Sequence, residues 1–334
     1  MRAFLLVTVL VTVGAIPLPA QESRTSQGTA QGTGVQQSEG PPIRVFVEEV
    51  TVPFIVTDNR NRIITDLTRE DFKVFEDKKP QEVTAFVQEA GVPLRVGLMI
   101  DTSNSIRDRF AFEQRAASDF LRTLLRPEKD LAFLASFDST AELVQDFTGD
   151  LGKLVEGIES LRSGGGTALY DAIFYGSRDR LLEGAPDLAS YRRAMVILSD
   201  GEDNQSRYSR LQALEVAQRA EVTIYTISTN IRGIRMPGDR VLQQFAEETG
   251  GRYFQPFNVT DLDAAFDAIN MELRSQYSIS YRPSTPRDGK YHEIEIAAQK
   301  RGLRVRARRG YFATVPPGFI PPTEPSGSSP NPER

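Results

Sequence analysis

The middle of this 334-residue chain alternates between short apolar runs and longer amphipathic stretches, which restricts the folds open to it. The runs LRVGLMI (94–100), RAMVILS (193–199) and VTIYTIS (222–228) are apolar almost throughout, as strands buried on both faces of a sheet are. Between such runs lie segments with helical periodicity, for example 108–125 and 261–276. The alternation predicts a three-layer, doubly wound, Rossmann-like α/β domain with a mostly parallel sheet.

Two further patterns complete the predicted organisation. Residues 129–147 hold two strand-like runs with no helix between them, so we expect one antiparallel hairpin at a sheet edge. Short β-branched segments with polar turns fill 43–92 and return in 276–314, where RDGK (287–290) is expected to close a hairpin. Because each flank alone has few strands, we expect the two to pair into a small accessory β unit beside an α/β domain at 93–275.

The two ends of the chain predict no fold. Residues 1–20 combine a positive start with an apolar run and small residues, the pattern of a secretory signal peptide with cleavage after Ala20 or Ala15; an uncleaved anchor is the alternative. Residues 21–42 are a polar, flexible linker and 315–334 a disordered tail. We therefore expect an exported protein, periplasmic, cell-surface or extracellular, with no transmembrane segment in the mature chain.

The composition excludes several kinds of chemistry. There is no cysteine, so disulfides and thiolate nucleophiles are absent. The single histidine, His292, lies in a predicted flanking strand, where we expect it at the surface, and a serine hydrolase or a His-rich zinc site therefore lacks its usual residues. A net charge of −5 argues against a nucleic-acid partner.

Oxygen-bearing side chains follow the predicted strands of the middle region. In DTSNS, the residues Asp101, Ser103 and Ser105 are spaced so that an extended loop points them the same way. Thr167 follows a glycine-rich loop and Asp200 follows a buried strand. Loops at the carboxyl ends of strands are the ligand-binding edge of such sheets, and hydroxyl and carboxylate oxygens suit a hard cation, Mg²⁺, Mn²⁺ or Ca²⁺. With only two carboxylates, the cation would still attract an outside carboxylate.

Plainer interpretations exist for several of these residues. Ser105 and Thr167 could each cap a helix, and SGGGT could hold a phosphate, although it lacks the lysine of a nucleotide-binding loop. Glu202 and Asp203 could be additional ligands or merely solvated. The alternating arginines of LRVRARR (303–309) could grip an anionic envelope polymer or protect an edge strand from aggregation, and we favour the second.

Together the three motifs resemble the metal-ion-dependent adhesion site of the von Willebrand factor type A domain. DTSNS matches the family's DxSxS pattern, GGGT its second-loop threonine and LSDG its third-loop aspartate. The resemblance covers the predicted α/β domain and implies that Ser103, Ser105 and often Thr167 contact the ion directly, with Asp101 and Asp200 acting largely through water. The flanking strands resemble those of a secreted bacterial group of related proteins.

The sequence thus favours an exported, metal-dependent protein-binding module of the adhesion type, with no catalytic activity. A Glu or Asp of the partner would complete the coordination of the ion. One alternative is an envelope scaffold or assembly factor with a purely structural ion, which would keep its partner after Asp101→Ala. A metal-dependent phosphoryl-transfer enzyme is another, but no lysine or second catalytic acid follows the right strands. The sequence leaves the partner, the ion and the oligomeric state open.

Overall fold

The computed structural model describes most of the chain between residues 49 and 313. The described segments are 49–88, 91–104, 110–183, 191–230, 234–284 and 288–313. The expected signal peptide, linker and tail lie outside them, as does Ser105. Among the described residues, none of the helices combines the length and the apolar character needed to cross a bilayer.

A six-stranded sheet forms the centre of the α/β domain, in the order β10-β9-β8-β5-β6-β7. Its strands are β5 (Leu94–Asp101), β6 (Leu131–Phe137), β7 (Ala141–Thr148), β8 (Arg192–Ser199), β9 (Thr223–Ser228) and β10 (Tyr253–Phe254). β5 pairs in parallel with both β6 and β8, and β9 pairs in parallel with β8 and β10. Of the strands described in this sheet only β7 is antiparallel, at the edge, which confirms the predicted hairpin.

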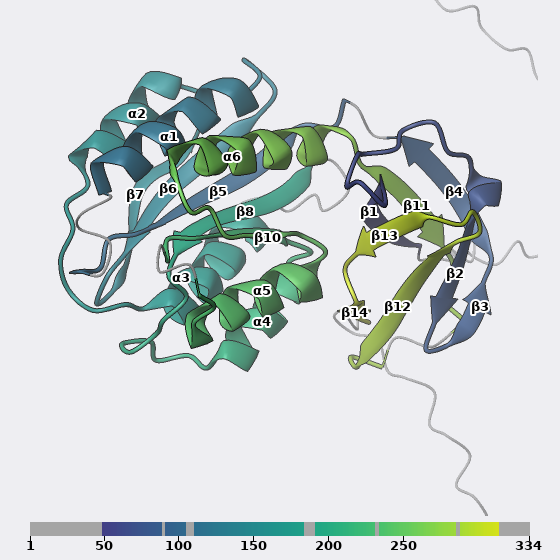
Figure 1. Ribbon diagram of the computed structural model, residues 1–334. Coiled ribbons are helices and arrows are strands. Elements are labelled where there is room, and N and C mark those ends of the chain that lie inside the picture. Colours follow the sequence, from purple (N-terminus) through teal and green to yellow (C-terminus); the bar gives the residue numbers. More distant parts are fainter. Residues whose placement is uncertain are drawn as a thin grey trace, which may run out of the picture. The chain divides into compact units, whose positions relative to one another are not determined.

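Helices cover both faces of this sheet (Figure 1). One face carries α1 (Phe110–Leu124), α2 (Leu151–Ser160) and α6 (Val259–Arg274). The other carries α3 (Leu169–Tyr175), which continues into a π-helical segment (η3, Gly176–Leu182), and then α4 (Arg210–Arg219) and α5 (Pro237–Thr249). The three-layer, doubly wound architecture predicted from the alternation is confirmed.

The alternation of side chains along β5 explains why two cores form. Val96, Leu98 and Ile100 belong to the core under α1 and α6, whereas Met99 belongs to the core on the opposite face. Successive residues of a strand point to opposite faces, so a strand buried on both sides must be apolar at nearly every position. A Cβ at Gly97 would lie 2.4 Å from the ring of Phe133, so the absence of a side chain there makes room for that ring.

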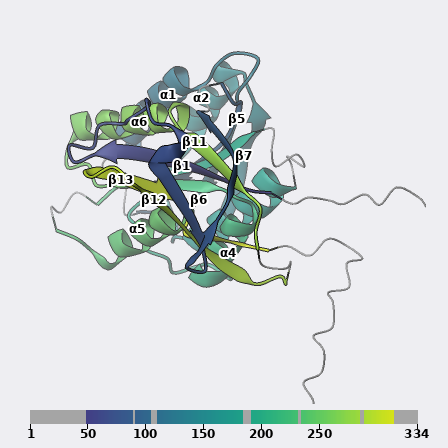
Figure 2. The ribbon, with the colours of Figure 1, turned by 90° about the vertical axis from the view of Figure 1, so that its right-hand side faces the viewer.

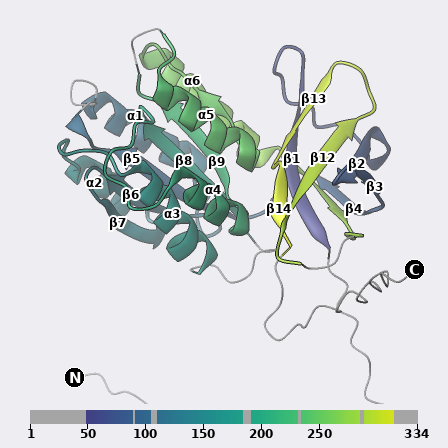
Figure 3. The ribbon, with the colours of Figure 1, turned by 90° about the horizontal axis from the view of Figure 1, so that it is seen from below.

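The two flanks of the chain form a second structural unit of two four-stranded sheets (Figure 3). One sheet has the order β13-β1-β11-β4 and the other β14-β12-β2-β3. Their strands are β1 (Val50–Asp58), β2 (Phe72–Glu76), β3 (Lys79–Gln81), β4 (Val83–Gln88), β11 (Tyr277–Tyr281), β12 (Tyr291–Ala298), β13 (Leu303–Ala307) and β14 (Gly310–Phe312). Phe54, Phe72, Phe86 and Tyr277 form an aromatic cluster between the sheets.

Each sheet contains strands from both flanks, and in the first sheet they alternate, as Figure 2 shows for β1, β11 and β13. β1 pairs with β11 on one side and β13 on the other, and β2 pairs with β12. The predicted pairing of the flanks is therefore confirmed, and neither flank can complete a sheet without the other. This β unit has its own apolar core, shared between both sheets.

The hairpin predicted at RDGK is wrong. Of its residues the structure describes Asp288 to Lys290, which contain a turn with Gly289 at φ 74°. The strands on either side do not pair: β11 bonds to β1 and β4, while β12 bonds to β2 and β14. The chain passes from one sheet of the β unit to the other at this point, and turn chemistry alone does not distinguish that crossing from a hairpin.

Arginines of β13 and of the two residues that follow it form ion pairs with glutamates of the α/β domain. Arg306 forms an ion pair with Glu272 of α6. Arg308 lies 2.8 Å from Glu221, which follows α4, and Arg309 contacts Glu247 and Glu248 of α5. Three of the four arginines in LRVRARR thus serve an intramolecular interface, a role that neither of the two interpretations of this strand foresaw.

Candidate metal centre

Asp101 is the last residue of β5 and lies completely buried. Its Oδ2 accepts a hydrogen bond of 2.6 Å from the hydroxyl of Ser199, the last residue of the neighbouring strand β8. Its Oδ1 accepts a bond of 2.9 Å from the backbone N–H of Ser103. The parallel register of β5 and β8 brings the two strand ends level, so the first and third motifs meet at one edge of the sheet.

Burial controls the electrostatics of Asp101. The pKa of its carboxyl is raised from 3.8 to about 6, chiefly by loss of solvent and also by the negative charge of Asp200, although hydrogen bonds from Ser103 and Ser199 oppose both effects. The influence of Asp200 shows that the two predicted acidic ligands are close enough to repel each other. A divalent cation bound beside Asp101 would favour its ionised form.

Backbone hydrogen bonds join the first loop to the second. The N–H of Gly164 donates to the carbonyl of Thr102 at 2.6 Å, and Asn104 donates to the carbonyl of Gly165 through both its backbone and its side-chain nitrogen. Gly165 has φ 76°, and a Cβ there would lie 2.9 Å from the hydroxyl of Ser139, so glycine is required at this position. The glycine-rich segment thus lets the second loop pass close to the first.

Thr167 is buried beside the third loop and does not cap a helix. α3 starts at Leu169, with Ala168 at its N-cap and no capping bond from a side chain. The Thr167 carbonyl accepts hydrogen bonds from the N–H groups of Asn204 and Gln205, and its own N–H donates to the Asn204 side chain at 3.0 Å. The capping interpretation of Thr167 is therefore wrong, because the backbone on both sides of this residue is tied to the third loop.

Two carboxylates, Asp203 of the third loop and Asp171 of α3, hold the third loop against α3. Asp203 accepts hydrogen bonds from the N–H of Tyr170 and from the hydroxyl of Ser206. Asp171 accepts from the N–H groups of Arg207 and Tyr208. Both oxygens of the half-buried Asp203 thus already accept hydrogen bonds that hold the loop in place.

The structure brings four of the five predicted ligands to one edge of the sheet, while the fifth, Ser105, lies outside the described residues. Ser103 and Thr167 are buried and Asp200 is half-buried, its Oδ1 accepting a bond of 3.1 Å from the N–H of Glu202. Hydrogen bonds connect every pair among the three loops. This donor set of hydroxyls and carboxylates, without sulfur or imidazole, fits a hard divalent cation.

Sequence reasoning missed the residues that support these ligands, chiefly Ser199 and Asn204. Ser199 is fully buried, and besides binding Asp101 its hydroxyl accepts a bond of 3.0 Å from the N–H of Gly201. The only signal for it was a hydroxyl at the end of an otherwise apolar strand. Asn204 stood within an acidic, polar loop and carried no distinguishing pattern.

The backbone of the Asp200 loop packs directly on the start of α5. Gly201 has φ 77°, and a Cβ there would lie 2.2 Å from the carbonyl oxygen of Gly238. In turn, a Cβ on Gly238 would lie 2.2 Å from the carbonyl oxygen of Asp200. Both contacts involve backbone atoms, which cannot move aside as a side chain can.

We expect Gly238→Ala to weaken both folding and cation binding. Alanine is normally the better helix residue by about 1 kcal/mol, but here its methyl group would push the Asp200 loop away, at a cost of about 1–3 kcal/mol. Thermal unfolding and Mg²⁺ titration calorimetry measure the two effects. Gly157→Ala, in the middle of α2 with its nearest contact a leucine methyl at 3.0 Å, is the matched control. A stabilised Gly238→Ala protein would contradict the packing argument.

A second group of acidic residues surrounds His292, which is buried rather than exposed as expected. Its ring nitrogens lie 2.8 Å from Asp77 Oδ2 and 3.1 Å from Asp288 Oδ1. Ligand atoms of Glu76, Asp77 and His292 lie within 4.8 Å of one another, close enough for a metal ion. However, Glu76 Oε2 already accepts bonds from two tyrosine hydroxyls and both imidazole nitrogens face carboxylates, so internal ion pairs account for the cluster.

The His292 cluster predicts a pH-dependent contribution to stability. Burial disfavours the imidazolium, but the carboxylates of Asp77 and Asp288 outweigh burial and raise the pKa of His292 above 6.5, while the pKa values of both carboxyls are lowered below 3.8. The stabilisation that His292 contributes is complete below about pH 6.5 and is lost as the pH rises through its raised pKa. The stabilisation that the two carboxylates contribute is complete above about pH 4. His292→Gln should therefore destabilise most, by about 1 kcal/mol, between pH 4 and 6.5. Urea unfolding at pH 5.5 and pH 9 tests this, and an equal loss at both values would contradict it.

Comparison with known proteins agrees with this geometry. Residues 96–202 match the family profile described as von Willebrand factor type A domain. This chain contains a von Willebrand factor type A domain. The matched segment starts in β5 and ends just after Asp200, so it includes all five predicted ligands. No curated protein matches the sequence at a significant level.

Several solved structures resemble the von Willebrand factor type A domain of this chain, all with low sequence identity. A von Willebrand factor type A protein from Catenulispora acidiphila is 12% identical over 73% of this chain and 72% of its own, with a TM-score of 0.48. An aerotolerance-related membrane protein from Bacteroides fragilis is 21% identical over 54% and 98%, with a TM-score of 0.43. Proximal thread matrix protein 1 of the mussel byssus, with a zinc-occupied MIDAS motif, is 14% identical over 60% and 50%, with a TM-score of 0.47.

Proposed function

We propose that this protein is an exported binding module whose von Willebrand factor type A domain holds a divalent cation and, through it, a carboxylate of a protein partner. The observation that carries the proposal is the set of hydrogen bonds joining all three oxygen-bearing loops: Asp101 to Ser199, Thr102 to Gly164, and Thr167 to Asn204. Loops that are up to about a hundred positions apart in the sequence are thereby joined, which supports a shared site.

The residues of the proposed centre divide into ligands and supports. Ser103, Ser105 and Thr167 would supply hydroxyl oxygens, and Asp101 and Asp200 would supply negative charge. When bound, the cation supplies a Lewis-acidic position for an outside carboxylate. Because three of the five donors are neutral, the bound cation keeps part of its positive charge, which favours an acidic side chain of the partner over a neutral one.

The hydrogen bonds of the loops support this arrangement. The buried Ser199 hydroxyl fixes the orientation of the Asp101 carboxylate, and Asn204 fixes the backbone on both sides of Thr167. Ligands held in place in this way lose little freedom on binding. The proposed chemistry is binding alone; no general base or nucleophile is required by it.

Capture of the partner in the presence of Mg²⁺ or of a chelator tests the proposal. Purified mature protein is immobilised and exposed to envelope extract, and bound proteins are identified by mass spectrometry. We expect a partner that is retained with Mg²⁺, lost with chelator, displaced by a soluble acidic peptide, and absent with Asp200→Ala. Asp119→Ala, a change at an exposed carboxylate of α1, is the matched control. A partner retained equally under all conditions would refute the adhesion mechanism and favour a scaffold with a structural ion.

Export is a separate part of the proposal and has its own test. It depends on residues 1–20, which lie outside the described residues. Expression of the full chain in a bacterial host, followed by sequencing of the mature amino terminus, should give a start after Ala20 or Ala15. Recovery of the intact chain in the cytoplasmic fraction would contradict export.

A further inference from the structure

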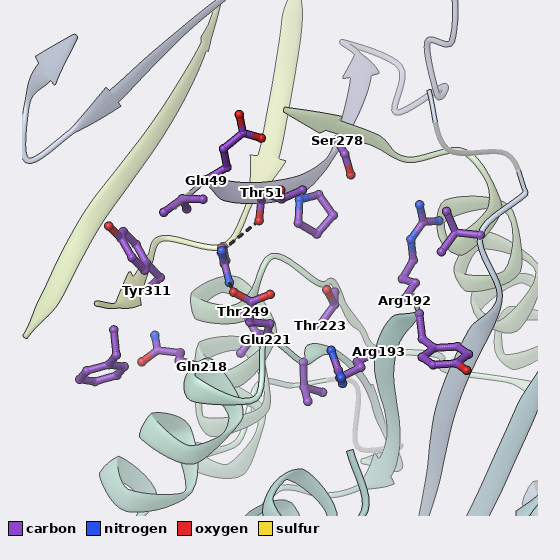
Figure 4. A pocket seen from close by; sticks show the side chains of 17 residues that line it. Glu49, Thr51, Arg192, Arg193, Gln218, Glu221, Thr223, Thr249, Ser278 and Tyr311 are labelled. Carbon is purple, nitrogen blue, oxygen red and sulfur yellow. Dashed lines mark hydrogen bonds and ion pairs between the residues drawn. The ribbon is translucent and has the colours of Figure 1, made fainter. Parts of the chain in front are cut away.

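A cavity of about 400 Å³ lies between the α/β domain and the β unit, at the opposite end of the central strands from the metal centre (Figure 4). It is lined by the first residues of β8 and β9, Arg192 and Thr223, and by Ser278 of β11. β8 has eight residues, so about 25 Å of strand separates this cavity from the end of the sheet that carries Ser199. The volume falls within the range of small-molecule sites, about 300–1,000 Å³.

Three arginines line the cavity although each is more than nine-tenths buried: Arg192 at 6% exposed, Arg193 at 3% and Arg308 at 7%. A guanidinium group stays charged at all ordinary pH values and carries five N–H donors. Burying such a group is costly unless its charge and its donors are compensated. Arg192 donates to the carbonyl of Leu273 and Arg193 to the carbonyl of Leu181, so Arg308 is the guanidinium with donors left for a ligand.

Arg308 shows the incomplete compensation most directly. Its Nη2 donates a 3.0 Å bond to the carbonyl of Thr51, and its Nη1 lies 2.8 Å from Glu221 Oε1. That ion pair does not have the geometry of a hydrogen bond, and Nε has no hydrogen-bond partner among the described residues. Glu221 itself is held at φ 53°, a backbone conformation that non-glycine residues rarely adopt. An anion in the cavity would accept the donors that Arg308 leaves unused.

The remaining walls of the cavity are apolar and aromatic. Tyr191, Tyr311 and Phe312 contribute rings, and Val92 and Val222 contribute aliphatic surface; Figure 4 shows Tyr311 on the wall opposite Arg192. An inorganic anion would leave this surface uncovered. A ligand with one charged end and an apolar body would satisfy the guanidinium donors and also remove apolar surface from water.

We infer that this cavity binds a small organic acid, with its carboxylate at the buried Arg308 and its apolar body against the aromatic wall. The site is independent of the metal centre, because its lining residues come from the amino-terminal ends of the central strands and from the β unit. It is also built from both structural units, so a bound acid would stabilise their interface.

Binding of 3-phenylpropionate, measured by titration calorimetry and by the rise in Tm, tests the inference. We expect saturable binding that chelator does not change, and no comparable binding of 3-phenylpropanol, which has the same body without the charge, or of inorganic phosphate. Equal binding of the alcohol would overturn the role of the arginines. Equal binding of phosphate would overturn the role of the apolar wall.

Three variants that are expected to change the affinity for 3-phenylpropionate in different directions make the test specific to this cavity. Ser278→Leu fills the cavity, keeps every charged group and should abolish binding. Arg308→Gln removes a charged donor and should raise the Kd about tenfold. Glu221→Gln removes a competing carboxylate and should lower the Kd, whereas Glu215→Gln, which changes an exposed carboxylate of α4, should not.

The outcome does not depend on the folding of any single variant. If Arg308→Gln does not fold, Ser278→Leu and Glu221→Gln still decide the question, because one blocks the cavity without changing its charge and the other changes its charge without blocking it. Wild-type affinity in Ser278→Leu, or weaker binding in Glu221→Gln, would overturn the inference.

Discussion

Asp101→Asn is expected to lower the affinity for Mg²⁺ and Mn²⁺ by about 100-fold while the protein stays folded. Asparagine keeps the size of the side chain and an oxygen for the Ser103 N–H, and the Ser199 hydroxyl can turn to accept from the new amide. What disappears is a negative charge at the proposed centre. Because burial raises the pKa of Asp101 to about 6, loss of this charge should not destabilise the metal-free protein.

Two measurements separate metal binding from folding in this variant. Titration calorimetry gives the metal affinity, and thermal unfolding with and without Mg²⁺ gives the stabilisation that bound metal provides, which should be present in the wild type and absent in the variant. Asp119→Asn on the exposed face of α1 should behave like the wild type in both. Unchanged Mg²⁺ affinity in Asp101→Asn would exclude Asp101 from the centre.

The same variant distinguishes the two interpretations of the function. If the cation receives a carboxylate of the partner, capture of the partner should fail with Asp101→Asn. If the cation is purely structural in an envelope scaffold, a folded Asp101→Asn protein should still capture its partner. The two hypotheses predict opposite results with the same reagent.

Asp130→Ala is expected to cause the largest loss of stability, about 3–5 kcal/mol. The carboxylate is buried next to the start of β5: Oδ1 accepts a bond of 2.8 Å from the N–H of Leu94, and Oδ2 accepts 2.7 Å from the N–H of Arg126 and 2.5 Å from Arg274. Alanine would leave two backbone donors and a largely buried guanidinium without their acceptor. Urea unfolding followed by circular dichroism measures the loss.

The contribution of Asp130 should also depend on pH in a defined direction. Burial alone would raise its pKa, but Arg274 and the two backbone donors outweigh burial and lower the pKa below 3.8. The stabilisation is therefore present above about pH 4 and is lost as the pH falls through the lowered pKa. Asp146→Ala, which breaks an exposed ion pair with Arg180, should cost less than about 1 kcal/mol at any pH. A similar small effect for Asp130→Ala would contradict this account.

Much of the fold could be predicted because local patterns report local burial. The apolar strands β5, β8 and β9 are hidden on both faces, which requires apolar residues at almost every position. The hairpin of β6 and β7 was readable because no helix separates its strands. Asp101 and Asp200 could be predicted as ligands because each carboxylate ends an apolar run, at the edge of the sheet where the parallel strands end.

Turn residues and side-chain type predicted strand pairing and burial less well where segments distant in the sequence meet. RDGK contains a turn, but whether its strands pair depends on the packing of two sheets. The residue type of His292 suggested the surface, yet the alternation of β12 places it on the buried face with Ile294 and Ile296, and Asp77, far away in the sequence, contacts its ring. The arginines of β13 and the residues after it have the pattern of a solvated strand face, but Arg306, Arg308 and Arg309 form ion pairs with acidic residues of the α/β domain.

The sequence by itself determined the alternation of strands and helices, the β character of both flanks and the identity of the oxygen-bearing loops. Only the tertiary structure decided that Ser199 orients Asp101, that Asn204 holds Thr167, and that buried arginines gather around a cavity between the two units. The physical reason is that periodicity records how each segment meets its immediate surroundings. A hydrogen bond or an ion pair between distant segments depends on which surfaces the completed fold brings together.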